Sequence, residues 1–555
     1  MEYIIIIILN FISCSILIAN GTLFKTLFNF NQQNDLIENG LYGLILVSLL
    51  TFTFNFFFEI SKKLNLFLFF FPFFLIFKKI YLLRKEILKK SILISLISSL
   101  IMLLENSNRP DAGLYHLPFI NIINDSKLIF GSANLEFRFG HTSILQYLAA
   151  GFNNIIFTEK GISIPLANIF AFTTIYIFNM YNRNESVLKV IFFLFLFNIL
   201  YSMNRYSGFG NDDPAHIFFY LVFCNFLLFI KDKHDDYKKN IIFFSTFVFL
   251  IKPFLILVFL IPLYLFISKE IKLFSKTNIF CSIIIILWFI KNIFISSCII
   301  YPEPKLCFKS LKWSTLNSEV SNPSRVKRTS EAWAKDWPNK KKNISQEDYI
   351  KDFNWLNTWK ENHFKIVINE ILPQVLIILV IIFIFPYERQ AFKISRKDSL
   401  IIFIFSFVCA ALWFLKFPIY RYGQSYIILL LISIFILTLN FKFRILNKNY
   451  NFINKFLSSI LIILSIGIIS KNLIRIYKNY NNLYVDYPWP KINSYTINND
   501  KNKNIKVYSN NGKFLYYKPS PYTLCMSSAS PCTSNSGVKN IKLSEFYGYK
   551  VYYYD

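Results

Sequence analysis

The sequence predicts an all-α protein that crosses a membrane many times and ends in a small α/β or mainly β module. Hydrophobic residues make up 54% of the 555 residues, and the mean hydropathy is +0.41. Apolar runs of about 15 to 20 residues recur from Tyr3 to Ser470, and a bilayer core about 30 Å thick requires runs of this length. The runs do not alternate in polarity, as the strands of a membrane barrel would. These observations favour helical spans.

The apolar runs predict about 13 to 14 membrane helices, some of them short or broken. The expected spans are 3–19, 37–58, 64–77, 91–105, 161–181, 187–203, 217–230, 241–251, 254–267, 278–297, 366–387, 400–416, 425–439 and 456–470.

The basic residues predict the orientation of the spans. Lysine and arginine gather in short connectors, and such loops stay in the cytoplasm. These connectors are 78–90, 231–239, 269–276, 388–397 and 442–455. The same placement accounts for much of the net charge of +28, and no nucleic-acid-binding motif accompanies it. We therefore expect no nucleic-acid partner.

A break is expected in the middle of 241–267. Its flanking connectors share a side only if this stretch crosses the membrane an even number of times. Lys252 and Pro253 stand at its centre, and proline disfavours a continuous helix. We expect two half-spans that turn at Lys252 on the outer side; the alternative is one tilted helix with Lys252 buried.

This topology divides the chain into six parts. They are the N-terminal spans 1–105, an external acidic loop 106–160 with an interfacial helix at 143–157, a transmembrane core 161–297 that contains the second external loop 204–216 and the break at 252–253, a large external loop 298–365, the C-terminal spans 366–470, and an external tail module 471–555.

Four cysteines are expected outside the membrane. Cys298 and Cys307 share the large loop, and Cys525 and Cys532 share the tail. Each pair could close a short disulfide in an oxidising compartment. The other four cysteines fall within spans and read as small apolar packing residues.

Ionisable residues gather at the outer ends of the spans. They are Asp111, His116 and Arg138 in the first loop, Asp212 and Asp213 in the second, Lys252 at the break and Arg421 in the connector 417–424. Each has a simple explanation, such as a solvated turn, a helix cap or a headgroup anchor. Together they are suited to transfer from a phosphate-activated lipid. A carboxylate can accept the acceptor's proton, while arginine and lysine hold the phosphate.

Five of the eight tryptophans lie in the large loop. They are Trp313, Trp333, Trp337, Trp355 and Trp359. Their rings could stack on sugars, or they could form an aromatic belt at the membrane surface. Both interpretations remain open.

Several short segments carry a resemblance to a known superfamily. They are 111–118 (DAGLYHLP), 131–135 (GSANL), 138–140 (RFG), Tyr301-Pro302, Trp333-Ala334, Arg421-Tyr422-Gly423 and Pro531-Cys532-Thr533. In these pieces and their order the chain resembles the GT-C superfamily of integral-membrane glycosyltransferases. It is more closely similar to a group of bacterial multispanning proteins related to that superfamily.

The resemblance implies an enzyme of the bacterial inner (plasma) membrane with its active site facing the periplasm. It would move a sugar from a polyprenyl-phosphate donor to a lipid-linked or cell-surface glycan acceptor. Asp111 matches the first-loop catalytic aspartate, and Asp212 or Asp213 matches the second-loop acid. A divalent cation, Mg or Mn, could take part, and Asp212 and Asp213 either support the base or bind this metal. Four spans precede the acidic loop here, where the superfamily typically has one.

The resemblance also implies that His116, Arg138, Lys252 and Arg421 contact the donor, chiefly through its phosphate. Two alternatives remain open. An O-antigen polymerase or ligase would also have large external loops that carry arginine and histidine. A non-enzymatic transporter of lipid-linked glycans would place ionisable residues at mid-membrane, and only Lys252 favours it.

Overall fold

The computed structural model describes most of the chain. The described ranges are 1–31, 35–104, 110–184, 186–201, 209–341, 343–384, 394–441, 450–479, 485–486, 489–490, 492, 505–509, 512–519, 524–527, 530–535, 537–538 and 540–555. The segments 204–208, 388–393 and 442–449 of the predicted loops lie outside them.

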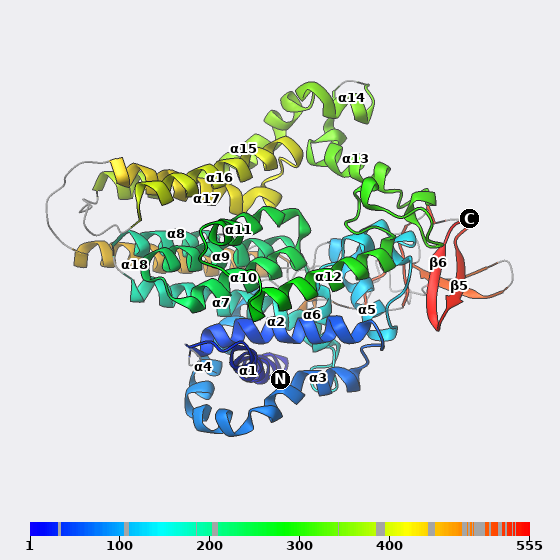
Figure 1. The fold of residues 1–555 in the computed structure, drawn as a ribbon, viewed down its shortest axis with the longest axis horizontal. Coiled ribbons are helices and arrows are strands. Elements are labelled where there is room, and N and C mark those ends of the chain that lie inside the picture. The colour runs from blue at the N-terminus through cyan, green and yellow to red at the C-terminus, as the bar shows by residue number, and fades with distance from the viewer. Residues whose placement is uncertain are drawn as a thin grey trace.

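The described chain is mostly helical, and its long helices pack into a bundle (Figure 1). The helices are α1 (Glu2–Leu27), α2 (Leu36–Asn55), α3 (Lys62–Leu75), α4 (Phe77–Leu104), α5 (Leu117–Asp125), α6 (Ile144–Phe152), α7 (Ile164–Arg183), α8 (Ser186–Tyr201), α9 (Asp212–Asp232), α10 (Asp235–Ile251), α11 (Leu260–Ile267), α12 (Lys276–Ser296), α13 (Pro323–Ala334), α14 (Gln346–Ile350), α15 (Leu356–Ile384), α16 (Arg396–Lys416), α17 (Tyr420–Phe441) and α18 (Tyr450–Asn479).

Ten helices in the described ranges are long and apolar enough to cross a membrane. They are α1, α2, α4, α7 with the turn before it, α9, α12, α15, α16, α17 and α18. The predicted class of a polytopic helical membrane protein is therefore confirmed. The expected count of spans was higher because it included the shorter apolar pieces, such as the 14-residue α3 and the stretch Pro253–Ile267.

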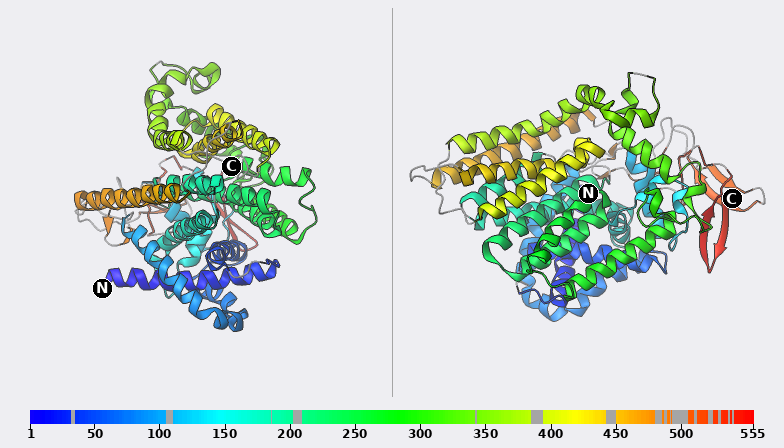
Figure 2. Two further views of the ribbon diagram at one scale, coloured as in Figure 1. Left: turned by 90° about the vertical axis from the view of Figure 1, so that its left-hand side faces the viewer. Right: turned by 45° about the horizontal axis from the view of Figure 1, so that its top comes forward.

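The middle of the bundle is formed by α7, α9 and α10, most of whose residues are buried. Figure 2 shows α1 to α4 on one side of them and α15 and α16 on the opposite side. The outer helices α15, α16 and α18 expose many apolar side chains. A helix in lipid satisfies its backbone internally and can keep an apolar outer face, so these faces suit a bilayer.

The chain breaks where Lys252 and Pro253 stand. Helix α10 ends at Ile251, and Lys252 adopts an extended conformation with φ −150° and ψ 95°. A 3-10 segment, η6 (Pro253–Phe259), then leads into α11. Proline removes a backbone donor and clashes with the preceding turn, which explains the break. The break leaves Lys252 at the same end of the bundle as the start of α9.

The segment 143–157, expected as an interfacial helix, forms the nine-residue helix α6, which is too short to span a bilayer. Ser143 and Gln146 form a capping box at its start. Every residue of α6 is buried. Helix α6 therefore packs inside the protein, whereas Ile155 and Ile156, which follow it, are exposed.

The described residues of the tail form three two-stranded antiparallel sheets. They pair β1 (Val485–Asp486) with β2 (Trp489–Pro490), β3 (Ile505–Tyr508) with β4 (Phe514–Lys518), and β5 (Lys542–Phe546) with β6 (Tyr549–Tyr553). Helix α18 continues to Asn479, so the tail begins later than expected. Strand β6 docks on the first loop, because Phe130 exchanges backbone hydrogen bonds of 2.9 Å with Lys550 and Tyr552.

Candidate functional site

A cluster of charged side chains lies at the start of α9. The carboxylate of Asp212 accepts a hydrogen bond from the ammonium group of Lys252. Its second oxygen lies 3.7 Å from Nε of Arg421. The three residues come from the second predicted loop, the break after α10 and the first turn of α17. The structure thus joins three predicted site residues that are distant in sequence. We call them the Asp212 cluster.

The local sequence places the Asp212 carboxylate at a helix N-terminus. Asp212, Asp213 and Pro214 occupy the first turn of α9. The helix dipole favours acidic residues there, and proline is tolerated because backbone N–H groups in the first turn have no partner within the helix. The cap position belongs to Asn211, which makes no side-chain capping bond. Asp212 therefore binds the two cations instead of capping the helix, while Asp213 is buried in the same turn.

Aromatic rings enclose the two cations of the Asp212 cluster. The Lys252 ammonium lies 4.0 Å from the ring centre of Tyr422. The guanidinium carbon of Arg421 lies 5.1 Å from the ring centres of both Trp333 and Tyr422. Such contacts contribute about 0.5 to 2 kcal/mol each. These ring contacts hold Lys252 and Arg421 in place while the two side chains also bind a negatively charged ligand.

His216, one turn into α9, braces the cluster from within the bundle. Its Nε2 lies 2.8 Å from the backbone carbonyl oxygen of Arg421, and its Nδ1 lies 2.8 Å from Oγ of Ser425. His216 therefore links α9 to α17 directly behind the arginine.

Asp111 approaches the cluster from the first loop. It immediately precedes a π-helical turn, η1 (Ala112–His116), and such turns are frequent at functional sites. The pKa of the Tyr115 phenol is raised by burial and by the negative charges of Asp111 and Asp212. The two acidic loops therefore meet around this phenol. Within the described residues, Asp111 has neither a hydrogen bond nor an ion pair, unlike Asp212.

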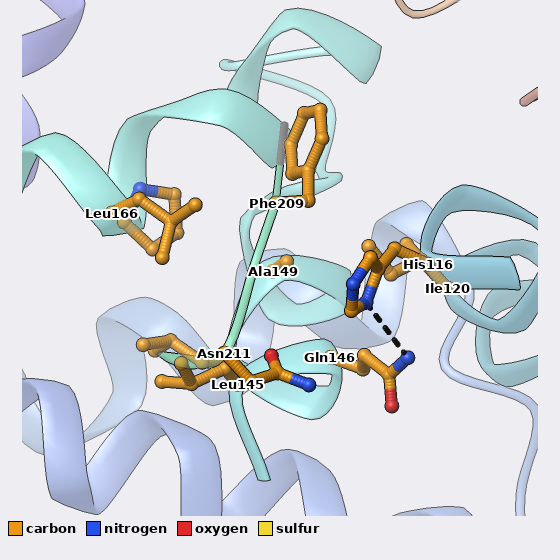
Figure 3. Close-up of a pocket in the computed structure, with 10 residues that line it drawn as sticks. His116, Ile120, Leu145, Gln146, Ala149, Leu166, Phe209 and Asn211 are labelled. Atoms are coloured by element: carbon orange, nitrogen blue, oxygen red, sulfur yellow. Dashed lines mark hydrogen bonds between the residues drawn. The ribbon is translucent and has the colours of Figure 1, made fainter. Parts of the chain in front are cut away.

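His116 lies beside the cluster and lines a small hollow (Figure 3). Its Nδ1 lies 3.4 Å from the amide nitrogen of Gln146. Burial lowers the pKa of His116 to about 3, so the ring is neutral near pH 7. The hollow is small, partly open and lined mainly by apolar side chains, with Asn211 on its wall. A neutral His116 can accept or donate one hydrogen bond but adds no charge for a phosphate.

Arg138 stands at the edge of the site and is already paired. Its Nη1 lies 2.9 Å from Oε1 of the buried Glu136. Its guanidinium carbon is 5.8 Å from the ring centre of Tyr115. Although the His141 ring is partly exposed, the surrounding protein lowers the pKa of His141 to about 4, and the charges of Arg138 and Lys252 add to the effect. Arg138 and Lys252 therefore lie on the same side of the protein.

The residues of the site do not fit a protein-bound divalent cation. No three His, Cys, Asp or Glu side chains in the described ranges come together as metal ligands. The charge of Asp212 is already balanced by Lys252 and Arg421.

Both candidate cysteine pairs are disulfide-bonded, Cys298 with Cys307 and Cys525 with Cys532. The four other cysteines are buried and free. Two contacts of the site were not predicted, namely that of Tyr422 with Lys252 and that of Trp333 with Arg421. The sequence did mark both residues, Tyr422 in the segment that follows Arg421 and Trp333 as one of the tryptophans that could stack on a sugar. Their partners were not predictable, because only folding brings the large loop and the break to α17.

A helical bundle with many apolar spans and a charged cluster at one end defines a multi-pass membrane protein. The chain belongs to a family described as a domain of unknown function (DUF8201), which matches residues 1–428. The match includes both acidic loops, the break and Arg421. No curated protein and no solved structure matches the chain.

Proposed function

We propose that this protein is a GT-C-like glycosyltransferase that moves a sugar from a polyprenyl-phosphate donor to a lipid-linked or cell-surface glycan acceptor. One observation carries the proposal. Two cations held by Asp212 lie beside a second carboxylate, Asp111, which has no partner in the described part of the chain. The first feature suits an anionic phosphate, and the second suits a general base.

The proposed reaction inverts the sugar's anomeric centre. The acceptor hydroxyl oxygen attacks the anomeric carbon, and the bond from that carbon to the phosphate oxygen breaks. The electron pair leaves with the lipid phosphate, and the hydroxyl proton passes to the carboxylate. Lys252 and Arg421 stabilise the negative charge that grows on the leaving phosphate.

The two aspartates have different roles in this scheme. Positive charges near a carboxylate favour its ionised form and weaken it as a base. Asp212 contacts Lys252 and Arg421, so it orients the cations. Asp111 forms no ion pair within the described residues, although its charge also acts on Arg421, and it is the proposed base. Arg138 is already paired with Glu136.

The proposed location is the bacterial inner membrane, with the Asp212 cluster facing the periplasm. The basic connector 231–239 supports this orientation, because it lies at the end of α9 opposite to Asp212. The two disulfides are also compatible with an oxidising compartment.

The test is complementation of a deletion strain with the wild-type gene, Asp111→Asn or Asp352→Asn. Asp352 is an exposed acid of the large loop outside the site, so its variant is the matched control. We expect Asp111→Asn to lower transfer by about 10²- to 10⁴-fold, because a general base is lost. Lipid-linked and surface glycans, resolved by mass spectrometry, would then lack one sugar. An unchanged glycan profile with Asp111→Asn would refute the proposed role.

A further inference from the structure

The tryptophans of the large loop differ in what they contact. Four of them pack against other parts of the protein. Trp313 donates a hydrogen bond of 2.8 Å to the carbonyl of Ile293, Trp337 packs edge-on against Tyr349, and Trp355 and Trp359 are buried against Phe414. These contacts give the four rings a structural role.

Trp333 is the exception, since 45% of it is exposed. Its neighbours in and after α13 are all buried, namely Glu331, Ala332, Ala334 and Lys335. Trp333 is thus an exposed aromatic side chain within a segment whose other residues, 331–335, are buried. The exposed part of Trp333 is therefore free to contact a ligand.

The helix that carries Trp333 is held in place at its end. Lys335 and Glu331 form an ion pair of 2.8 Å, and Lys416 of α16 lies 3.8 Å from the same carboxylate. The Tyr349 hydroxyl donates a hydrogen bond of 2.8 Å to the carbonyl of Lys335. These contacts fix the position of the helix end that carries Trp333.

The ring of Trp333 adjoins the Asp212 cluster. The guanidinium carbon of Arg421 lies 5.1 Å from its centre, and Nε of Arg421 lies 3.7 Å from Asp212. A tryptophan that only anchors the protein at the membrane surface has no reason to contact Arg421, a residue of the candidate site. The position therefore favours a ligand that is bound in part by Arg421.

We infer that Trp333 is a saccharide-stacking residue that holds the pyranose ring of a sugar whose phosphate is bound by Arg421 and Lys252. This inference rests on the proposed function. The apolar C–H face of a pyranose packs on an aromatic face, while its hydroxyls remain free for polar partners. The sugar is joined directly to the phosphate, so it must lie next to the cations. Trp333 is thus a specificity-determining residue for the shape of the donor sugar.

The test measures binding to the full-length protein in detergent by isothermal titration calorimetry. The probes are inorganic phosphate and the 1-phosphates of glucose, galactose and mannose. We expect at least one sugar phosphate to bind the wild type about tenfold more tightly than phosphate, a gain of about 1.4 kcal/mol. Trp333→Ala should lose this gain of sugar phosphates over inorganic phosphate, whereas Trp333→Phe, which keeps an aromatic face beside Arg421, should retain most of it.

Two controls separate this inference from the proposed function. Phe308→Ala removes another exposed aromatic of the large loop and should leave both affinities unchanged. Arg421→Ala should weaken phosphate and sugar phosphates alike. If Trp333→Ala binds sugar phosphates as tightly as the wild type, the stacking role is overturned while the phosphate site stands. If phosphate binding is absent, or is unaffected by Arg421→Ala, the cation site and the stacking role both fail.

Discussion

His116 is a single titratable residue that its surroundings keep neutral. The residue is 2% exposed, and its ring centre lies 4.1 Å from that of Tyr115. Gln146 is its hydrogen-bonding partner. Burial lowers its pKa to about 3, and the negative charge of Asp212 opposes this shift only in part. The proton that an unfolded chain would bind near pH 6.5 is therefore excluded from the folded protein.

This exclusion predicts a stability that depends on pH. The contribution of neutral His116 is fully present above about pH 6.5 and is lost as the pH falls toward about 3, because only the unfolded state binds the proton in that window. The apparent Tm of the wild type should therefore fall more steeply between pH 6.5 and pH 4 than that of His116→Gln. Differential scanning fluorimetry in detergent measures both curves, and parallel curves would contradict the prediction.

Five helices contribute side chains to a buried network around the Lys25–Glu38 ion pair, away from the Asp212 cluster. Lys25 of α1 pairs with Glu38 of α2, and both are buried. The Tyr176 hydroxyl of α7 donates a 3.0 Å hydrogen bond to Glu38, and Asn240 of α10 donates another. Asn240 also donates a 2.8 Å hydrogen bond to Asn225 of α9. A carboxylate with this many donors can remain charged in the interior.

Breaking this ion pair on one side should destabilise the protein strongly. Glu38→Leu leaves Lys25 buried and without its carboxylate, which typically costs about 3 to 5 kcal/mol. The double variant Lys25→Met with Glu38→Leu removes both charges and should recover much of that loss. Unfolding in mixed micelles measures the free energies. A double variant no more stable than Glu38→Leu would contradict this explanation.

The C-terminal tail, the part of the molecule farthest in sequence from the first acidic loop, forms hydrogen bonds with that loop. The backbone N–H of Met526 donates a 3.1 Å hydrogen bond to the carbonyl of Gly113, within the turn that follows Asp111. A Cβ on Gly113 would lie 2.2 Å from Sδ of Met526, so glycine allows this approach. The hydroxyl of Thr533 donates a 2.9 Å hydrogen bond to the carbonyl of Leu135. The docked segment is closed by the Cys525–Cys532 disulfide.

Opening that disulfide should loosen the loop that carries Asp111. In Cys525→Ser with Cys532→Ser, segment 110–125 should exchange its amide hydrogens faster, because the docked segment gains conformational freedom worth about 2 kcal/mol. Hydrogen exchange with mass spectrometry follows this segment directly. Lys542→Gln, which changes an exposed ion pair of the same tail, is the control. Equal exchange in all three proteins would show that the disulfide does not restrain the loop.

The membrane class of the whole molecule was predictable, whereas the number of spans was less so. Length and apolarity of a run decide whether a helix can cross a bilayer, and both are local properties of the sequence. The run at 254–267 is equally apolar, yet it forms a 3-10 segment and an eight-residue helix after Pro253. The run at 143–157 became a short buried helix. Packing decides such cases, because neighbouring helices can cover a short apolar segment.

By itself, the sequence determined the helical membrane class, the break at Lys252 and Pro253, and the two cysteine pairs. These depend on composition and on neighbours in the chain. Only the tertiary structure decided that Asp212 pairs with Lys252 and Arg421 while Asp111 has no partner in the described chain, and that Trp333 lies beside Arg421. The physical reason is that such contacts join residues far apart in sequence. Their partners are chosen by the packing of whole helices, which a local pattern does not encode.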